Sequence, residues 1–178
     1  MEFILTPFMY LAGFGLVLSL FVHISALLGL PSPFGEIAWG LHFGIFVVWI
    51  PVVIVMNSLT KDFKNRDLWK AALRACPKWM KYLTYFFFGY AILNFILFAI
   101  IDIGGGRGGG VGTPSNVYRG FSGHWMAFYC AAMAILYSAI HMKEHDEARR
   151  CPNRYPVSPS AKFCEECGSK IIEHQDIR

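Results

Sequence analysis

No Asp, Glu, Lys or Arg occurs between residues 3 and 35, which read FILTPFMYLAGFGLVLSLFVHISALLGLPSPFG. Three further stretches share this property, residues 37–60, 82–101 and 120–142, and each of the four has at least 20 residues. An α-helix crosses the hydrocarbon core of a bilayer, about 30 Å thick, in about 20 residues. The sequence therefore predicts an all-α integral membrane protein, a bundle of four transmembrane helices over about 3–30, 37–60, 82–102 and 120–142.

The composition agrees with a membrane protein. Of 178 residues, 55% are hydrophobic and 16% are charged, whereas about a quarter of the residues in a soluble domain are charged. This hydrophobicity excludes an intrinsically disordered chain, and the five cysteines are too few for a disulfide-stapled miniprotein. The first apolar stretch follows an acidic Glu2 and is longer than the apolar core of a signal peptide, so we expect it to stay on the protein.

The cationic residues indicate an orientation. Residues 61–81 carry seven Lys and Arg and residues 143–178 carry seven more, which leaves two of the sixteen elsewhere. Because cytoplasmic loops of membrane proteins are enriched in Lys and Arg, we expect both termini in the cytoplasm, most simply at a bacterial inner (plasma) membrane. The net charge of +4 is then a signal of topology, and it does not indicate a nucleic-acid partner.

The cytoplasmic loop is predicted to contain a short amphipathic helix over about 67–76. Apolar side chains, among them Trp69 and Leu73, recur there at helical spacing, and Lys70, Arg74 and Lys78 follow one another four residues apart. Such a helix suits the inner surface of a bilayer, where basic side chains meet anionic lipid headgroups and tryptophan meets the interface.

Small residues recur at intervals of four in the apolar stretches, as in Gly40 and Gly44 or Cys130 and Ala134. Small side chains allow membrane helices to approach closely. We therefore expect a compact bundle, formed within one chain, in a homo-oligomer or in a larger membrane complex.

Four ionisable residues, one from each predicted membrane helix, fall in one layer near the outer surface: His23, His42, Asp102 and His124. Ionisable groups at membrane depth are costly and suggest function. These residues could ligate a b-type haem or a transition metal, or relay protons. The alternative is a polar structural cluster at the interface. Flanking residues favour His42 as the most interior, His124 next and His23 last.

The composition changes after Met142, where a polar tail begins. Its segments Cys151-Pro152 and Phe163-Cys164-Glu165-Glu166-Cys167-Gly168 resemble the two knuckles of a zinc ribbon, over about residues 151–172. A C-x-x-C-G knuckle directs two thiolates at one zinc ion, and glycine takes the strained backbone position. The resemblance implies a structural zinc site, favoured over a disulfide in the reducing cytoplasm.

The tail departs from the ribbon pattern at one ligand. Ribbons of this type have Cys or His three or four residues after the first cysteine, where this chain has Arg154 and Tyr155. Three ligands remain, Cys151, Cys164 and Cys167, and a fourth could come from His145 or His174. Otherwise the site is degenerate, or the last two cysteines form a bare dithiol.

The membrane part resembles no family, and it contains no catalytic motif. We divide the chain into a transmembrane domain, residues 1–142, and a cytoplasmic zinc-ribbon-like tail, residues 143–178. This organisation favours a non-enzymatic adaptor, accessory subunit or regulator that acts through its cytoplasmic face. The alternatives are a haem- or metal-binding redox subunit that uses the outer histidines, and a proton- or ion-conducting oligomer.

Overall fold

The computed structural model describes residues 2–61, 63, 67–100, 114–148, 151–153, 155, 157 and 161–171. Within these ranges helices joined by turns make up the chain as far as residue 148, and the described part of the tail has turns and one isolated bridge. The elements are α1 (Glu2–Leu27), the 3₁₀ helix η1 (Gly35–Trp39), α2 (Gly40–Thr60), α3 (Leu68–Ala72), α4 (Lys78–Phe98) and α5 (Pro114–Ala148).

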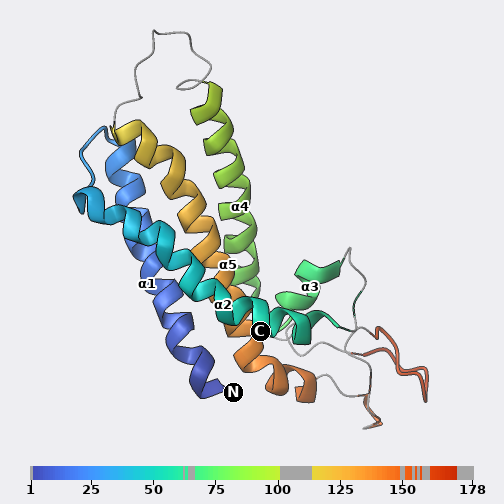
Figure 1. Cartoon of the computed structure of the whole chain (residues 1–178). Helices are drawn as coiled ribbons and strands as arrows, with labels where there is room; N and C mark the ends of the chain where they lie inside the picture. The colour runs from blue at the N-terminus through green and yellow to red at the C-terminus, as the bar shows by residue number, and fades with distance from the viewer. Residues whose placement is uncertain are drawn as a thin grey trace.

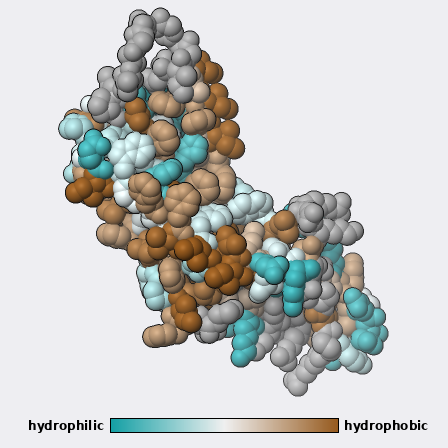
Figure 2. Space-filling model, in the orientation of Figure 1, coloured by the Kyte–Doolittle hydropathy of each residue, from teal (hydrophilic) through white to brown (hydrophobic). Residues whose placement is uncertain are grey.

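Four of the described helical segments are long and apolar enough to cross a membrane: Phe3–Leu27, Gly35–Thr60, Lys78–Phe98 and Ser115–His145. This confirms the predicted number and order of apolar helices. Brown, hydrophobic atoms lie over much of the helices in Figure 2, with teal patches near the upper end and more of them toward the lower end, beside α3 and the tail. The N-terminus of α1 and the tail lie at that same end in Figure 1.

The helix ends differ from the predicted ones. Pro77, with ψ of 149°, immediately precedes α4, so the helix starts at Lys78 and includes the cationic Lys81. Helix α5 extends beyond its charge-free stretch at both ends, from Pro114 to Ala148. A stretch without charges marks the part of a helix that suits hydrocarbon, whereas the helix itself continues where charged side chains meet headgroups or water.

Helix α5 is the centre of the bundle, with α1, α2 and α4 around it (Figure 1). In its most apolar part 61% of the residues are buried, against 22% in each of the other three spans. The largest fully buried side chain is Trp125 on α5. Helices α1, α2 and α4 therefore all pack on α5, and the side chains of α5 form the surface that each of them contacts.

Two glycines allow α1 and α2 to approach the ring of Tyr129 on α5. A Cβ atom at Gly15 would overlap the Tyr129 ring, and one at Gly44 would overlap its hydroxyl oxygen. That hydroxyl donates a hydrogen bond of 2.7 Å to the carbonyl of Leu41. The prediction of close packing at small residues therefore holds at Gly15 and Gly44, but a Cβ at Gly40 would meet nothing within 4 Å.

The loop between α2 and α4 packs against the bundle through a helix shorter than the predicted one. Helix α3 has five residues, and the turn after it buries Leu73 and Cys76. The Arg74 guanidinium donates a 2.8 Å hydrogen bond to the carbonyl of Leu59, near the end of α2. The sequence pattern assigned Arg74 to a lipid-facing stripe, but this side chain instead satisfies a helix-terminal carbonyl.

Candidate functional site

The sulfur atoms of Cys151, Cys164 and Cys167 form a cluster in the tail. All three lie within 4.8 Å of one another, and the sulfurs of Cys151 and Cys167 are 3.1 Å apart. None of the three is in a disulfide. Two segments separated in sequence thus bring three soft metal ligands to one point.

The second knuckle has the backbone that a metal site needs. Gly168 has φ of +68°, and its N–H donates to the carbonyl of Cys164 over 2.9 Å. A bridge between Phe163 and Lys170 closes the hairpin around this turn. In the first knuckle, the backbone N–H of Asn153 points at the Cys151 sulfur over 3.4 Å. Such N–H groups stabilise a thiolate.

The donor set fits a thiophilic metal such as zinc. At a Zn–S length of about 2.3 Å, tetrahedral geometry separates two sulfurs by about 3.8 Å. The separation of 3.1 Å between the Cys151 and Cys167 sulfurs therefore requires these two atoms to move apart by less than an ångström. Hydrogen bonds to Ser169 and to the Cys151 sulfur lower the pKa of the Cys167 thiol to about 6, whereas burial raises the pKa of Cys151. One ligand is thus largely deprotonated at neutral pH.

The fourth ligand is not identified among the described side chains. His145, on the last turn of α5, is not a member of the close cluster. His174 lies outside the described residues, and so does Asp102 of the outer layer.

The three outer histidines separate into two environments. His23 is 3% exposed, and its Nδ1 lies 2.7 Å from the hydroxyl oxygen of Ser122 on α5. Its Nε2 lies 2.5 Å from the hydroxyl oxygen of Tyr90 on α4. The sequence ranking, which placed His23 last, was wrong, because residues distant in the sequence supply polar partners from two other helices. Ser122 is itself fully buried.

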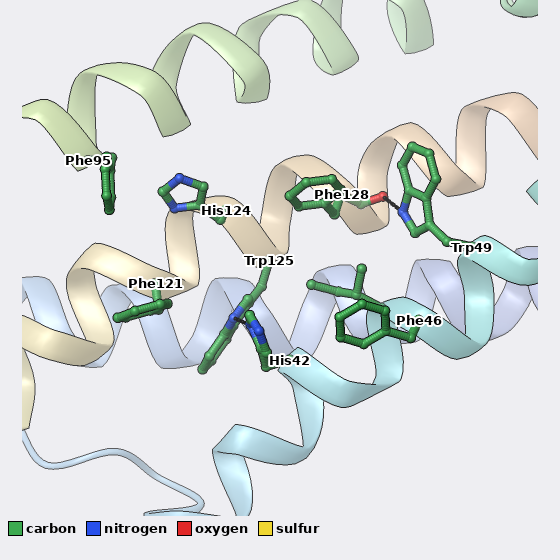
Figure 3. A pocket seen from close by; sticks show the side chains of 9 residues that line it. His42, Phe46, Trp49, Phe95, Phe121, His124, Trp125 and Phe128 are labelled. Carbon is green, nitrogen blue, oxygen red and sulfur yellow. Dashed lines mark hydrogen bonds between the residues drawn. The ribbon is translucent and has the colours of Figure 1, made fainter. Parts of the chain in front are cut away.

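His42 and His124 instead line one hollow of about 430 Å³ on the face of α5 between α2 and α4. Figure 3 shows the aromatic side chains of the three helices around it. The lining residues are His42, Ile45, Phe46, Trp49, Phe95, Phe121, His124, Trp125 and Phe128. The lining residues of α2 are three or four positions apart, and so are those of α5, as expected for one face of a helix. This spacing is the sequence pattern that could have identified the two helix faces.

Hydrogen bonds fix one nitrogen of each of these two rings. The indole N–H of Trp125 donates to Nδ1 of His42 over 3.0 Å (Figure 3). Nδ1 of His124 lies 3.2 Å from the carbonyl oxygen of Gly120, one turn earlier on the same helix. An indole nitrogen only donates and a carbonyl only accepts. The neutral His42 therefore carries its proton on Nε2, and His124 carries its proton on Nδ1.

These tautomers bear on the haem hypothesis. A histidine ligates iron through a nitrogen without a proton, and its other nitrogen donates a hydrogen bond. His124 has this arrangement, but Nε2 of His42 is protonated and both nitrogens of His23 have hydrogen-bond partners. The described geometry therefore offers no support for a haem held by two of the three.

Comparison with protein families, curated proteins and solved structures gives no match to this chain.

Proposed function

We propose that this protein is a membrane-bound adaptor or regulator whose cytoplasmic tail is folded by a zinc ion and serves as its contact surface. The observation that supports it is the cluster of Cys151, Cys164 and Cys167 sulfurs. Three thiols that converge at one point, two of them in a C-x-x-C segment, are the donor set of a structural metal site.

The tail needs the metal because its described residues form almost no core. Its buried apolar cluster consists of Cys151, Cys164 and Ile171, with Val157 packed against them. Burial of so few side chains stabilises by only a few kcal/mol, which does not offset the cost of ordering about twenty residues at about 1–2 kcal/mol each. Metal binding supplies the missing free energy in small modules of this kind.

The cluster is also tied closely to the membrane part. Cys151 follows the last residue of α5, Ala148, by three positions, so it lies within about 11 Å of the helix end. Helix α5 is the most buried helix of the bundle. A protein that binds the tail is therefore held at the membrane surface and is connected to the centre of the bundle, which suits an accessory subunit.

Zinc content and contact formation test the proposal together. Protein purified in reducing buffer should contain stoichiometric zinc, and Cys164→Ser should lose it, whereas Cys130→Ser, a cysteine buried in the bundle, should keep it. Crosslinking in native membranes should give adducts through the tail that Cys164→Ser loses and Cys130→Ser retains. Wild-type protein without zinc, or adducts that are identical in both variants, would contradict the proposal.

The fourth ligand follows from the same measurement. We compare the zinc affinity of His145→Ala, His174→Ala and the double variant by competition with a chelator. If one histidine completes the site, its single variant and the double variant should bind zinc about 10- to 100-fold more weakly than wild type, whereas the other single variant should bind like wild type. Wild-type affinity in all three variants would show that neither histidine is the ligand.

The orientation is part of the proposal, since the tail must face the cytoplasm. Lys70 in α3 and Glu36 in η1 come from loops on opposite sides of the predicted membrane. In the variant lacking native cysteines, Glu36→Cys should react with an impermeant thiol reagent applied to intact cells, and Lys70→Cys only after lysis. The reverse pattern would place the tail outside.

The redox and conduction hypotheses stay predictions. A Soret band in the purified protein would support the first, and proton flux in liposomes would support the second.

A further inference from the structure

The three clustered thiols of the tail differ in their access to solvent. Of the five cysteines in the chain, four are buried and one is exposed: Cys76, Cys130, Cys151 and Cys164 are buried, and Cys167 is exposed. The exposed fractions of Cys151 and Cys164 are only 2% and 3%. A small solute that reacts with sulfur therefore reaches Cys167 first, because protein covers the other thiols.

Cys167 has a second thiol within reach. Its sulfur lies 3.1 Å from the sulfur of Cys151, a separation from which a disulfide forms with a small movement of either side chain. The two cysteines belong to different knuckles, 16 positions apart in the sequence. An exposed cysteine beside a second thiol that can resolve it is the arrangement typical of redox-sensing cysteines.

The third thiol, Cys164, is part of the hydrogen-bonded turn of the second knuckle. Its backbone N–H donates to the carbonyl of Ser169 over 2.8 Å, and its carbonyl accepts from the N–H of Gly168 over 2.9 Å. A disulfide between Cys164 and Cys167 would have to close within this turn, whereas one between Cys151 and Cys167 links two separate segments. The contact of 3.1 Å therefore points to Cys151 as the partner.

We propose that Cys151 and Cys167 are a peroxide-sensitive pair that controls whether the tail holds its metal, an inference that rests on the proposed function. Both thiols are deprotonated when they bind zinc. The Cys167 thiolate attacks one oxygen of hydrogen peroxide, the O–O bond breaks, and hydroxide leaves, so that Cys167 becomes a sulfenic acid. The Cys151 thiolate attacks this sulfur, the S–O bond breaks with loss of a second hydroxide, and the disulfide forms. Two electrons thus pass from the two sulfurs to one peroxide molecule.

The disulfide removes two of the three thiolate ligands from the site. Cys164 is then the one thiolate left of the cluster, whereas a structural zinc site needs four protein ligands. A disulfide that closes a loop of this length stabilises a fold much less than a structural zinc ion does. Oxidation should therefore release zinc and unfold the contact surface, and reduction by cytoplasmic thiols in the presence of zinc should restore it.

The test follows zinc and disulfides together, in full-length protein that is loaded with zinc and freed of reductant. Hydrogen peroxide is added in steps, released zinc is measured with a chromogenic chelator, and peptide mass spectrometry maps the disulfides. Zinc release should rise in proportion to the Cys151–Cys167 disulfide, and dithiothreitol with added zinc should reverse both. Cys130→Ser is the control and should behave like wild type, since Cys130 is buried in the bundle.

Two further measurements show whether the fold selects this pair. In denaturant, where every thiol is accessible, the map should show mixed disulfides. In Cys151→Ser the sulfenic acid at Cys167 lacks its partner, so its labelling by dimedone should rise severalfold over wild type. Unchanged labelling would overturn the proposal.

The outcomes in wild type separate this inference from the zinc proposal. Zinc that stays bound in excess peroxide, or a disulfide between Cys164 and Cys167, would overturn the inference and leave the zinc proposal intact. Purified protein without zinc would contradict the proposed function, and the disulfide map would then decide by itself whether Cys151 and Cys167 are the reactive pair.

Discussion

The bundle and the tail solve the same problem, stability, by different means. In the bundle, α5 buries 61% of its most apolar part against three helices, and its polar side chains find partners, as His23 does between Ser122 and Tyr90. In the described part of the tail the buried core is Cys151, Cys164 and Ile171, so two of the three clustered thiols belong to that core. Stability spread over many contacts tolerates the loss of one, whereas a tail folded by one ion, as proposed, would not tolerate the loss of that ion.

Removal of the metal should therefore have the largest effect, and the effect should be confined to the tail. Cys164→Ser, or a chelator added to wild type, should make the chain sensitive to protease after residue 143, because the module loses the free energy of metal binding. The fragment left should be the intact bundle. Limited proteolysis followed by mass spectrometry measures this. Cleavage within α1 to α4 at the same rate would show that bundle and tail unfold as one unit.

Within the bundle, the largest effect should come from a methyl group at the closest helix contact. Gly15→Ala places a Cβ atom in the ring of Tyr129, and we expect a loss of about 1–3 kcal/mol from overpacking. Gly89→Ala is the matched control, because a Cβ there meets nothing within 4 Å. Denaturant unfolding in detergent compares the two. Equal stabilities would mean that α1 does not approach α5 as closely as described.

The polar partners of His23 should contribute somewhat less. His23→Phe keeps a ring of similar size but leaves the hydroxyls of Ser122 and Tyr90 without their partner, which should cost about 1–2 kcal/mol. His141→Phe is the control, since His141 bonds only to the backbone of its own helix among the described contacts. In a double-mutant cycle with Tyr90→Phe, a coupling energy near zero would show that the bond from His23 to Tyr90 does not contribute.

These cases also show what the sequence could and could not predict. A helix that crosses a bilayer must be long and free of charge, so the four apolar stretches predicted the four helices. The direction in which a side chain points depends on its neighbours. His23 meets Ser122, 99 residues away, and Tyr90, 67 residues away, and nothing in its own segment indicates either partner. The same limit hid the hollow, because its walls come from three helices.

In the tail the sequence was more informative. The spacing of Cys164 and Cys167 and the glycine after them determine the local turn, so the three-cysteine cluster was predicted correctly. The fourth ligand, His145 or His174, stays a prediction, because the positions where such ribbons carry Cys or His are occupied by Arg154 and Tyr155 and His174 lies outside the described residues. A ligand from elsewhere in the chain depends on tertiary structure, which the local pattern does not contain.

The smallest effect should be on the reactivity of Cys76, in the turn between α3 and α4. Its side chain is fully buried, its thiol donates to the carbonyl of Ala134 over 2.9 Å, and burial raises its pKa to about 12. A raised pKa keeps the thiol protonated, so at pH 8 only about one molecule in 10⁴ carries the reactive thiolate. In native protein at pH 8, Cys76 should not react with a maleimide within an hour, and in denaturant it should react fully, as measured by mass spectrometry of its peptide.

The control for Cys76 is Lys70→Cys, which should react at once. Lys70 lies two residues before the end of α3, and its side chain is 77% exposed in wild type. If Cys76 reacted as fast as that control, the segment after α3 would not pack on α5, and the contrast between a well-packed bundle and the tail would have to exclude the end of the bundle beside α3.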